Sequence, residues 1–303
     1  MRKNFSVNYD FVNTRLDRWF RKNVCEAPQS LIEKNIRNGK IKVNKKKNKS
    51  SYRLQKGDQI SVIDFKFTPS KSKKYKDKYQ ATKKELSDSS NLFIEDNENF
   101  VVINKPAGIA VQSGTKSRKN ILDILRSTRE FEGSSPYAVH RIDKETTGVL
   151  IVAKNRKYAQ LFTSLFRVRK IYKTYLGVVL GQLKKNNGTL KDELFYYENE
   201  KKTKAIAITH YVVLGTNYNY SLLKLNPETG RKHQLRKQLL IHGYPILGDT
   251  KYRMSKNPPG KKNNLMLHAY KINFSIAGTK YNFSVDPPPA FKNILREKYL
   301  RTF

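Results

Sequence analysis

Ionisable side chains are concentrated in one short stretch directly before an apolar run. Five of them lie within six positions: His140, Arg141, Asp143, Lys144 and Glu145. Gly148 and the unbroken apolar run 149–153 follow, and such a run predicts a strand buried on both faces of a sheet. Because buried charge must be paired, a polar cluster beside a core strand is costly and is tolerated mainly at functional sites. The stretch therefore indicates a site, with a plain charged loop as the alternative.

A carboxylate in this position suggests nucleophilic or electrostatic catalysis, as carboxylates perform in glycoside chemistry. Such a group must be ionised in a largely dry cavity. Burial raises the pKa of an aspartate, and a nearby arginine opposes that change. Asp143 is the aspartate of this stretch, and Arg141 lies two residues before it.

Three ordered motifs resemble those of one enzyme family. The sequence His-Arg-Ile-Asp-Lys-Glu-Thr-Thr-Gly-Val-Leu at 140–150 closely resembles the active-site motif of the RluA-type pseudouridine synthases. Asn-Lys-Pro-Ala-Gly at 104–108 and Thr-Gly-Arg-Lys-His-Gln-Leu-Arg at 229–236 match two more of its motifs, and Pro-Ile-Leu-Gly-Asp follows at 245–249. The resemblance covers essentially the whole chain. It implies an isomerase that converts uridine in RNA to pseudouridine.

This reaction breaks the N-glycosidic bond, turns the base and rejoins it through carbon. Nothing is oxidised and no group is imported, so no cofactor is chemically required. The resemblance implies that Asp143 is the catalytic carboxylate. It could attack the ribose, attack the uracil ring, or drive elimination through a glycal.

The resemblance also assigns supporting residues. Arg236 matches the arginine that pairs with the catalytic aspartate, and Tyr175 matches the tyrosine that stacks on the target base. Arg141 matches an arginine that enters the space left by the flipped nucleotide, since a stacked base must be extruded before reaction. We expect Leu235 to line the same pocket. Taken singly, Arg236 would be an ordinary helix surface charge and Tyr175 ordinary core packing.

Four further positions carry smaller expectations. We assign Lys105 and Pro106 to shaping the site, and His140 to a structural role. The family commonly has serine where Thr147 stands and histidine where Gln238 stands. We expect the first change to be mild and the second to alter RNA contacts.

Composition narrows the possible partners. Lys and Arg number 61 against 25 Asp and Glu, a formal charge of +36, which favours a polyanion such as nucleic acid; a general lysine bias in the source proteome is the alternative. No apolar run approaches the roughly 18 residues of a membrane span. Cys25 is the single cysteine and no secretory signal is visible, so we expect a cytoplasmic location. The five histidines show no metal-ligand spacing, so we expect no metal, and we expect a monomer.

Residues 1–68 resemble a ribosomal-protein-S-four-like RNA-binding domain. Helices are predicted near 14–20 and 28–37, and strands at 40–44 and 59–63. The order of elements, Val-Asn at 43–44 and Gly-Asp at 57–58 carry the resemblance. It implies phosphate contacts, which position RNA rather than read its sequence. The candidates are Arg15, Arg18, Arg21, Lys34 and Arg37.

Two further segments complete the chain. Residues 69–91 are lysine-rich and too polar to bury a core, so they predict a flexible linker. Residues 92–303 predict an α+β catalytic domain with a mixed, mostly antiparallel sheet. Strands are expected at 92–94, 100–103, 149–153, 171–180, 205–214, 220–226, 265–276 and 280–285, and helices after 117, at 158–166, at 230–241 and after 289.

The most similar branch of the family is that of RluC, which acts on large-subunit (23S) ribosomal RNA. The same chemistry on another ribosomal site or on transfer RNA is an alternative. A second class of function is an idle RNA-binding ribosome-assembly protein that keeps the fold. A nucleotide-phosphate enzyme is disfavoured, because 229–232 contains no Gly-rich phosphate loop after a strand.

Overall fold

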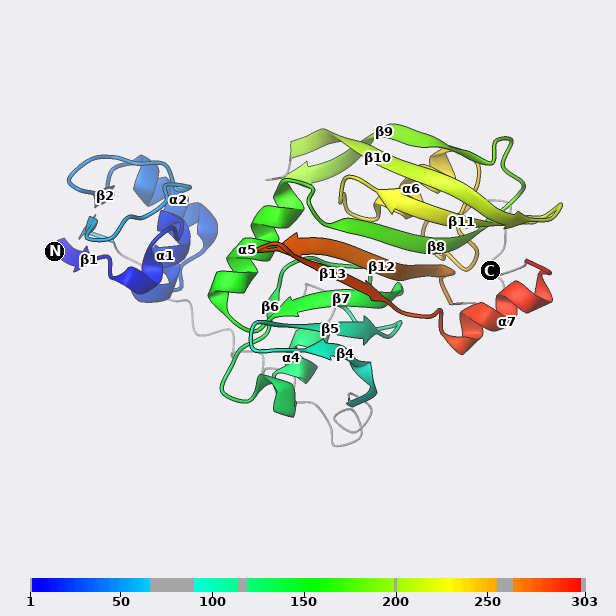
Figure 1. Cartoon of the computed structure of the whole chain (residues 1–303). Coiled ribbons are helices and arrows are strands. Elements are labelled where there is room, and N and C mark those ends of the chain that lie inside the picture. The colour runs from blue at the N-terminus through cyan, green and yellow to red at the C-terminus, as the bar shows by residue number, and fades with distance from the viewer. Residues whose placement is uncertain (1, 66–89, 114–118, 199–200, 255–263, 301–303) are drawn as a thin grey trace. The chain divides into compact units, whose positions relative to one another are not determined.

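The computed structural model describes residues 2–65, 90–113, 119–198, 201–254 and 264–300. The chain divides into two compact units, Met1–Asp77 and Lys78–Phe303 (Figure 1). The linker predicted at 69–91 lies outside the described residues, apart from its last two positions. The boundaries predicted at 68 and 91 stay predictions.

The first unit packs two helices against a small antiparallel sheet. Its helices are α1 (Leu16–Asn23) and α2 (Gln29–Arg37), and a 3-10 turn, η1 (Tyr9–Phe11), precedes them. The sheet has the order β1-β3-β2, with β1 (Arg2–Ser6), β2 (Ile41–Val43) and β3 (Gln59–Ile63). Both helices and the last two strands match the sequence prediction. The prediction missed β1, because Phe5 is the only apolar residue in it.

The Val-Asn and Gly-Asp signatures of this unit meet in space. The Asn44 amide donates to the Asp58 carboxylate at 2.8 Å, and the Asn44 side-chain oxygen accepts from the Gln59 N–H at 2.8 Å. Asp58 also accepts from the Gln55 N–H at 2.8 Å. These bonds close the turn into β3, so the paired polar residues give the turn its structure rather than a binding function.

The second unit is built on a 10-stranded mixed sheet, and the described strands confirm the predicted α+β class. Its order is β4-β5-β7-β12-β8-β11-β10-β9, with β13 beside β12 and β6 beside β7 (Figure 1). The strands are β4 (Phe93–Asp96), β5 (Phe100–Lys105), β6 (Tyr137–Ala138), β7 (Thr147–Ala153), β8 (Tyr172–Leu180), β9 (Asn187–Glu198), β10 (Lys201–Thr216), β11 (Tyr220–Pro227), β12 (Leu267–Ile276) and β13 (Thr279–Ser284).

One parallel pairing joins two antiparallel halves of this sheet. Strand β7 of the first half pairs with β12 of the second through only two residue pairs, Thr147 with His268 and Gly148 with Ala269. Gly148 has a φ of +108°, and a Cβ atom there would lie 2.2 Å from the Ala269 carbonyl oxygen. The two halves can therefore approach this closely only because residue 148 is glycine.

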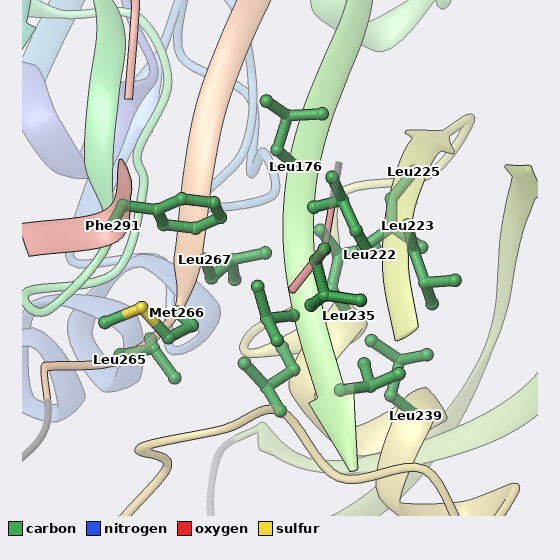
Figure 2. Packing of buried hydrophobic residues seen from close by; sticks show 14 of the residues in the cluster. Leu176, Leu222, Leu223, Leu225, Leu235, Leu239, Leu265, Met266, Leu267 and Phe291 are labelled. Carbon is green, nitrogen blue, oxygen red and sulfur yellow. The ribbon is translucent and has the colours of Figure 1, made fainter. Parts of the chain in front are cut away.

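Helices and apolar side chains fill both faces. The helices are α4 (Ile121–Leu125), α5 (Arg156–Arg167), α6 (Gln234–Ile241) and α7 (Pro289–Glu297), with 3-10 turns η2 (Ser90–Leu92) and η3 (Arg129–Phe131). Figure 2 shows how Leu235 and Leu239 of α6 enter a cluster with Leu176 of β8 and Leu225 of β11. This packing fixes the position of α6 against the sheet.

In this unit the predicted start of one helix was wrong, and one strand was missed. The helix expected at 230–241 begins only at Gln234, because His233 adopts a left-handed conformation with a φ of +54°. Strand β9 was not predicted, because its inward residues Leu190 and Leu194 alternate with exposed polar positions over a short span. The hydrogen bonds to the long strand β10 hold this segment as a strand, although its own sequence does not predict one.

We predict that Gly148→Ala lowers the free energy of unfolding by roughly 3 kcal/mol or more, because the methyl group must push β12 away from β7. Urea denaturation followed by circular dichroism measures the effect. Gly230→Ala is the matched control, since a Cβ there meets no atom within 4 Å. Equal stability of the two variants would contradict the close approach at the parallel pairing.

Candidate active site

Asp143 lies in the loop between β6 and β7, directly before the central strand. The neighbouring Ile142 is buried in the core, and the Thr146 N–H donates to the Asp143 carbonyl at 3.1 Å. The Asp143 side chain is 17% exposed, so its carboxylate opens onto solvent through a cleft. A short, internally bonded loop thus presents the carboxylate from a fixed backbone.

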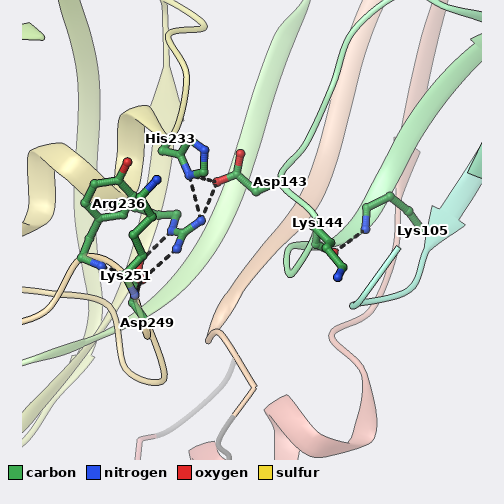
Figure 3. Close-up of polar contacts among 8 residues, drawn as sticks. Lys105, Asp143, Lys144, His233, Arg236, Asp249 and Lys251 are labelled. Atoms are coloured by element: carbon green, nitrogen blue, oxygen red, sulfur yellow. Dashed lines mark hydrogen bonds and ion pairs between the residues drawn. The ribbon is translucent and has the colours of Figure 1, made fainter. Parts of the chain in front are cut away.

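Lys105, at the end of β5, donates a hydrogen bond to the backbone of this loop at Lys144 (Figure 3). It is fully buried, and its ammonium donates to the carbonyls of Pro106, Ile109 and Lys144 at 2.6, 2.9 and 3.1 Å. Burial lowers the pKa of Lys105 to about 7, against the opposing charges of Glu145 and Asp143. Three carbonyl acceptors compensate for the burial of this cation.

Arg236 is placed by a second carboxylate. From α6 its Nε and Nη2 atoms donate to the two Asp249 oxygens, both at 2.7 Å, in a bidentate pair (Figure 3). Asp249 also accepts from the N–H groups of Lys251 and Tyr252, both at 2.9 Å. Burial raises the pKa of Asp249, but its bonds to Arg236 and these N–H groups outweigh burial and hold the pKa below its ordinary value.

The remaining nitrogen of Arg236 is directed at Asp143. Nη1 donates to the Asp143 Oδ2 atom at 3.2 Å and to His233 Nδ1 at 2.9 Å. Burial alone would lower the pKa of Arg236, but Asp249 and Asp143 raise it overall, so the guanidinium stays charged.

His233 completes this group. Burial and the nearby cations, Arg236 first, lower its pKa, although Asp143 opposes them. Because arginine cannot accept a hydrogen bond, His233 Nδ1 must be the acceptor and carry no proton. The 3.4 Å between His233 Nδ1 and Asp143 is therefore a contact and not an ion pair.

Tyr175, Arg141 and Leu235 line the same cleft as Asp143, which has a volume of about 740 Å³. Tyr175 packs against the apolar clusters of both halves of the sheet. Burial, and then the charge of Asp143, raises the pKa of Tyr175, so its hydroxyl stays protonated. Arg141 is exposed at the cleft, whereas Leu235 is buried in its wall. The structure thus brings Asp143 together with the four residues predicted to support it, which are Arg141, Tyr175, Leu235 and Arg236.

His140 is half-buried in the cleft wall and serves the fold. Its Nε2 accepts from the Ile151 N–H of β7 at 2.9 Å, and its ring stacks on Phe166 with centroids 4.7 Å apart. Burial lowers the pKa of His140 to about 3, with a smaller contribution from Lys173. A neutral ring is what the hydrogen bond from Ile151 requires.

The expectation that Gln238 alters RNA contacts was wrong, because its side chain is fully buried. It accepts from the Thr209 hydroxyl at 2.7 Å and donates to the Leu190 carbonyl at 3.1 Å and to Asp192 at 2.8 Å. Gln238 therefore joins α6 to β9 and β10. Thr147 bonds to the buried His268 at 2.8 Å, which agrees with a mild substitution.

Asp249 and His233 were missed as site residues, although both lie within or just after the third motif. A buried arginine on α6 requires a carboxylate partner, and this requirement could have identified Asp249. Asp249 follows the helix, directly after a glycine turn. Within the described ranges no three His, Cys, Asp or Glu side chains gather where a metal ion could be held. No helix in that part of the chain is long and apolar enough to cross a bilayer.

The five candidate RNA contacts of the first unit differ in whether their side chains are already hydrogen-bonded within the protein. Arg15 is engaged with the buried Asp17, at 3.1 Å from Nε and 2.7 Å from Nη2, and Arg21 donates to Gln29 at 2.9 Å. The other three candidates are exposed: Arg18, Lys34 and Arg37. Arg15 is therefore the least available of the five.

We predict that Asp249→Asn destabilises the protein by roughly 3 kcal/mol, because the Arg236 charge would stay buried without its bidentate partner. Urea denaturation measures the loss. The exposed pair of Lys292 with Asp286, at 2.7 Å, provides the control, and Asp286→Asn should change stability by less than about 1 kcal/mol. Similar effects of the two substitutions would contradict the importance of burial.

Known proteins resemble this chain along most of its length. A family model described as RNA pseudouridylate synthase matches residues 99–240. "Ribosomal large subunit pseudouridine synthase C" of Buchnera aphidicola subsp. Schizaphis graminum is 32% identical over 95% of each chain. The protein of the same name from Rickettsia felis is 32% identical over 91% of this chain and 94% of its own.

A solved human structure, "RNA Pseudouridylate Synthase Domain Containing 4", is also similar. It superposes with a TM-score of 0.62 at 26% identity, and the match covers 72% of this chain and 96% of the human one. Fold and sequence therefore lead to one assignment. The chain belongs to the RluA-type family of RNA pseudouridylate synthases and is an isomerase.

Proposed function

We propose that this protein isomerises specific uridines of 23S ribosomal RNA to pseudouridine, and that Asp143 is the catalytic carboxylate. The observation that carries the proposal is the 3.2 Å bond from Arg236 to Asp143 within a cleft that Tyr175 also lines. The ribosomal target is supported by the names of the relatives from Buchnera and Rickettsia, which are ribosomal large subunit synthases. We further propose that the protein acts as a monomer in the cytoplasm.

Each side chain of the cleft has a part in this reaction. Arg236 stabilises the negative charge of Asp143, and Asp249 keeps the guanidinium in place. Tyr175, with its protonated ring hydroxyl, offers a face on which the extruded uracil stacks. Arg141, exposed at the cleft, fills the gap that the flipped base leaves in the RNA. The geometry therefore serves cleavage of the N-glycosidic bond and formation of the carbon–carbon bond between the same base and sugar, and neither step needs another reactant.

We predict that Asp143→Asn abolishes pseudouridine formation and leaves RNA binding within about twofold, because the amide keeps the shape of the carboxylate and loses its charge. Tritium release from uracil-labelled RNA measures the activity, and filter binding measures affinity. Mapping of pseudouridines in cells lacking the protein identifies the target and separates ribosomal from transfer RNA. If the wild-type protein formed no pseudouridine in any cellular RNA, the idle RNA-binding alternative would hold.

We also propose that the first unit is a ribosomal-protein-S-four-like domain that binds RNA phosphates. A groove of about 830 Å³ on this unit supports the proposal. Its lining includes Arg37 at the end of α2 and Lys47, Asn48, Lys49 and Ser50 of the following loop. Cations, an amide and a hydroxyl are the groups that contact phosphate oxygens. Among the described residues of this lining, Glu33 is the only acid.

We predict that replacing Lys47 and Lys49 together with glutamine weakens RNA binding and reduces the slope of log affinity against log salt by about 1.5, because two phosphate contacts are lost. Filter binding between 50 and 200 mM salt measures the slope. The matched control replaces Lys3 and Lys56, which are exposed on the same unit but do not line the groove. Equal slopes for the two double variants would contradict the groove as the RNA contact.

A further inference from the structure

Lys173 is a largely buried cation for which no anionic partner occurs among the described residues. It belongs to β8 and lines the cleft together with Asp143 and Tyr175. Lys173 and Tyr175 are alternate residues of one strand, so their side chains share a face and their Cα atoms lie about 6.6 Å apart. The charge that acts on Lys173 most is that of Arg169, which is another cation.

The one carboxylate near this end of the cleft is already engaged. Glu228 lines the cleft, but it lies 2.7 Å from His210 and 3.6 Å from Arg169. The other cleft-lining charges are mostly positive: Arg141, Arg167, Arg169, Arg231 and Lys232, with Asp143 as the second acid. Asp143 is bonded to Arg236. The protein therefore supplies Lys173 with no counter-charge from its own cleft wall.

A buried ammonium without a counter-charge is costly, and proteins seldom keep one unless a ligand pairs with it. Burial, and then Arg169, lowers the pKa of Lys173 to about 8. Lys105 shows the contrast, since it is fully buried yet has three carbonyl acceptors at 2.6 to 3.1 Å. No such acceptors of Lys173 occur in the described part of the chain, and its side chain lines the cleft that takes the substrate.

We propose that Lys173 binds a phosphodiester group of the RNA beside the target uridine and thereby positions that nucleotide over Tyr175. This inference rests on the proposed function. A phosphate held at Lys173 neutralises the unpaired cation, and the alternation of β8 places it next to the tyrosine ring. Lys173 is a positioning residue here, because it would contact the RNA backbone and not the sugar–base bonds that break and form.

The first test replaces Lys173 with methionine, which is similar in length and uncharged. We expect KM to rise about tenfold or more, the usual effect of losing a charged hydrogen bond, with kcat changed less than twofold. The midpoint of thermal unfolding should stay the same or rise, because an unpaired buried charge is removed. Lys224→Met is the control: Lys224 is half-buried on the neighbouring β11 and pairs with Leu176, so it lies on the opposite face of the sheet. A lower unfolding midpoint with unchanged KM would assign Lys173 a structural role and overturn the proposal.

The second test neutralises the phosphate instead. An RNA that the wild-type protein modifies is made with a methylphosphonate linkage on either side of the target uridine. One linkage should weaken binding to the wild-type protein about tenfold and leave binding to Lys173→Met unchanged, because the two changes remove the same contact. Additive losses for both linkages would overturn the proposal. An absence of pseudouridine formation by the wild-type protein on every RNA would instead overturn the proposed function, and this inference with it.

The third test is the dependence on pH. Phosphate binding favours the charged form of Lys173, so its contribution to affinity is complete below pH 8 and is lost as the pH rises above that value. Arg169 and His140 interact electrostatically with Lys173. The charged or titratable groups Arg167, Tyr175, Glu228 and Arg231 line the same cleft. Lys173→Arg keeps its charge throughout, so the rise of KM above pH 8 should disappear in that variant and persist in the wild type and in Lys224→Met. The same rise in the arginine variant would show that another group titrates, which would contradict the proposal.

Discussion

The guanidinium of Arg236 is shared between two carboxylates, and this sharing determines the geometry of the whole site. Asp249, whose side chain is fully buried, takes two nitrogens in a bidentate pair, and Asp143 takes the third. A buried arginine needs this compensation, because either charge alone would be strongly destabilising. Asp249 therefore fixes the position of the guanidinium. Asp143 makes a single, longer hydrogen bond to it and stays partly exposed to the cleft.

The site is assembled across the join between two halves of one sheet. Asp143 comes from the loop before β7, whereas Tyr175 and Arg236 come from β8 and α6 of the other half. Strand β12 lies between β7 and β8 and holds them together. Gly148 permits the contact with β12, and Tyr175 packs against the apolar clusters of both halves. A polar cluster can thus lie beside core strands because backbone carbonyls and one arginine satisfy its charges.

The local sequence pattern was sufficient to predict elements whose own residues determine their secondary structure and burial. The apolar run of β7 and the spacing of α5 predicted both elements, and the motifs predicted Asp143, Tyr175 and Arg236 as neighbours. The sequence pattern failed to predict elements whose structure depends on contacts with residues far away in the chain. Strand β9 depends on its pairing with β10, and the start of α6 depends on the left-handed His233. Gln238 was expected to alter RNA contacts from its helix, but its side chain bonds to β9 and β10 and is buried.

The parallel pairing of β7 with β12 also has a consequence for biosynthesis. It joins residues 147–148 to residues 268–269, which are separated by more than a third of the chain. A nascent polypeptide released only as far as α6 would already contain Asp143, Tyr175 and Arg236, but it would lack the strand that sets β7 beside β8. Contacts of such long range form late, because the ends of a large loop must first be brought together. Translation must therefore have passed β12 before this protein can act on any RNA, including that of the ribosome making it.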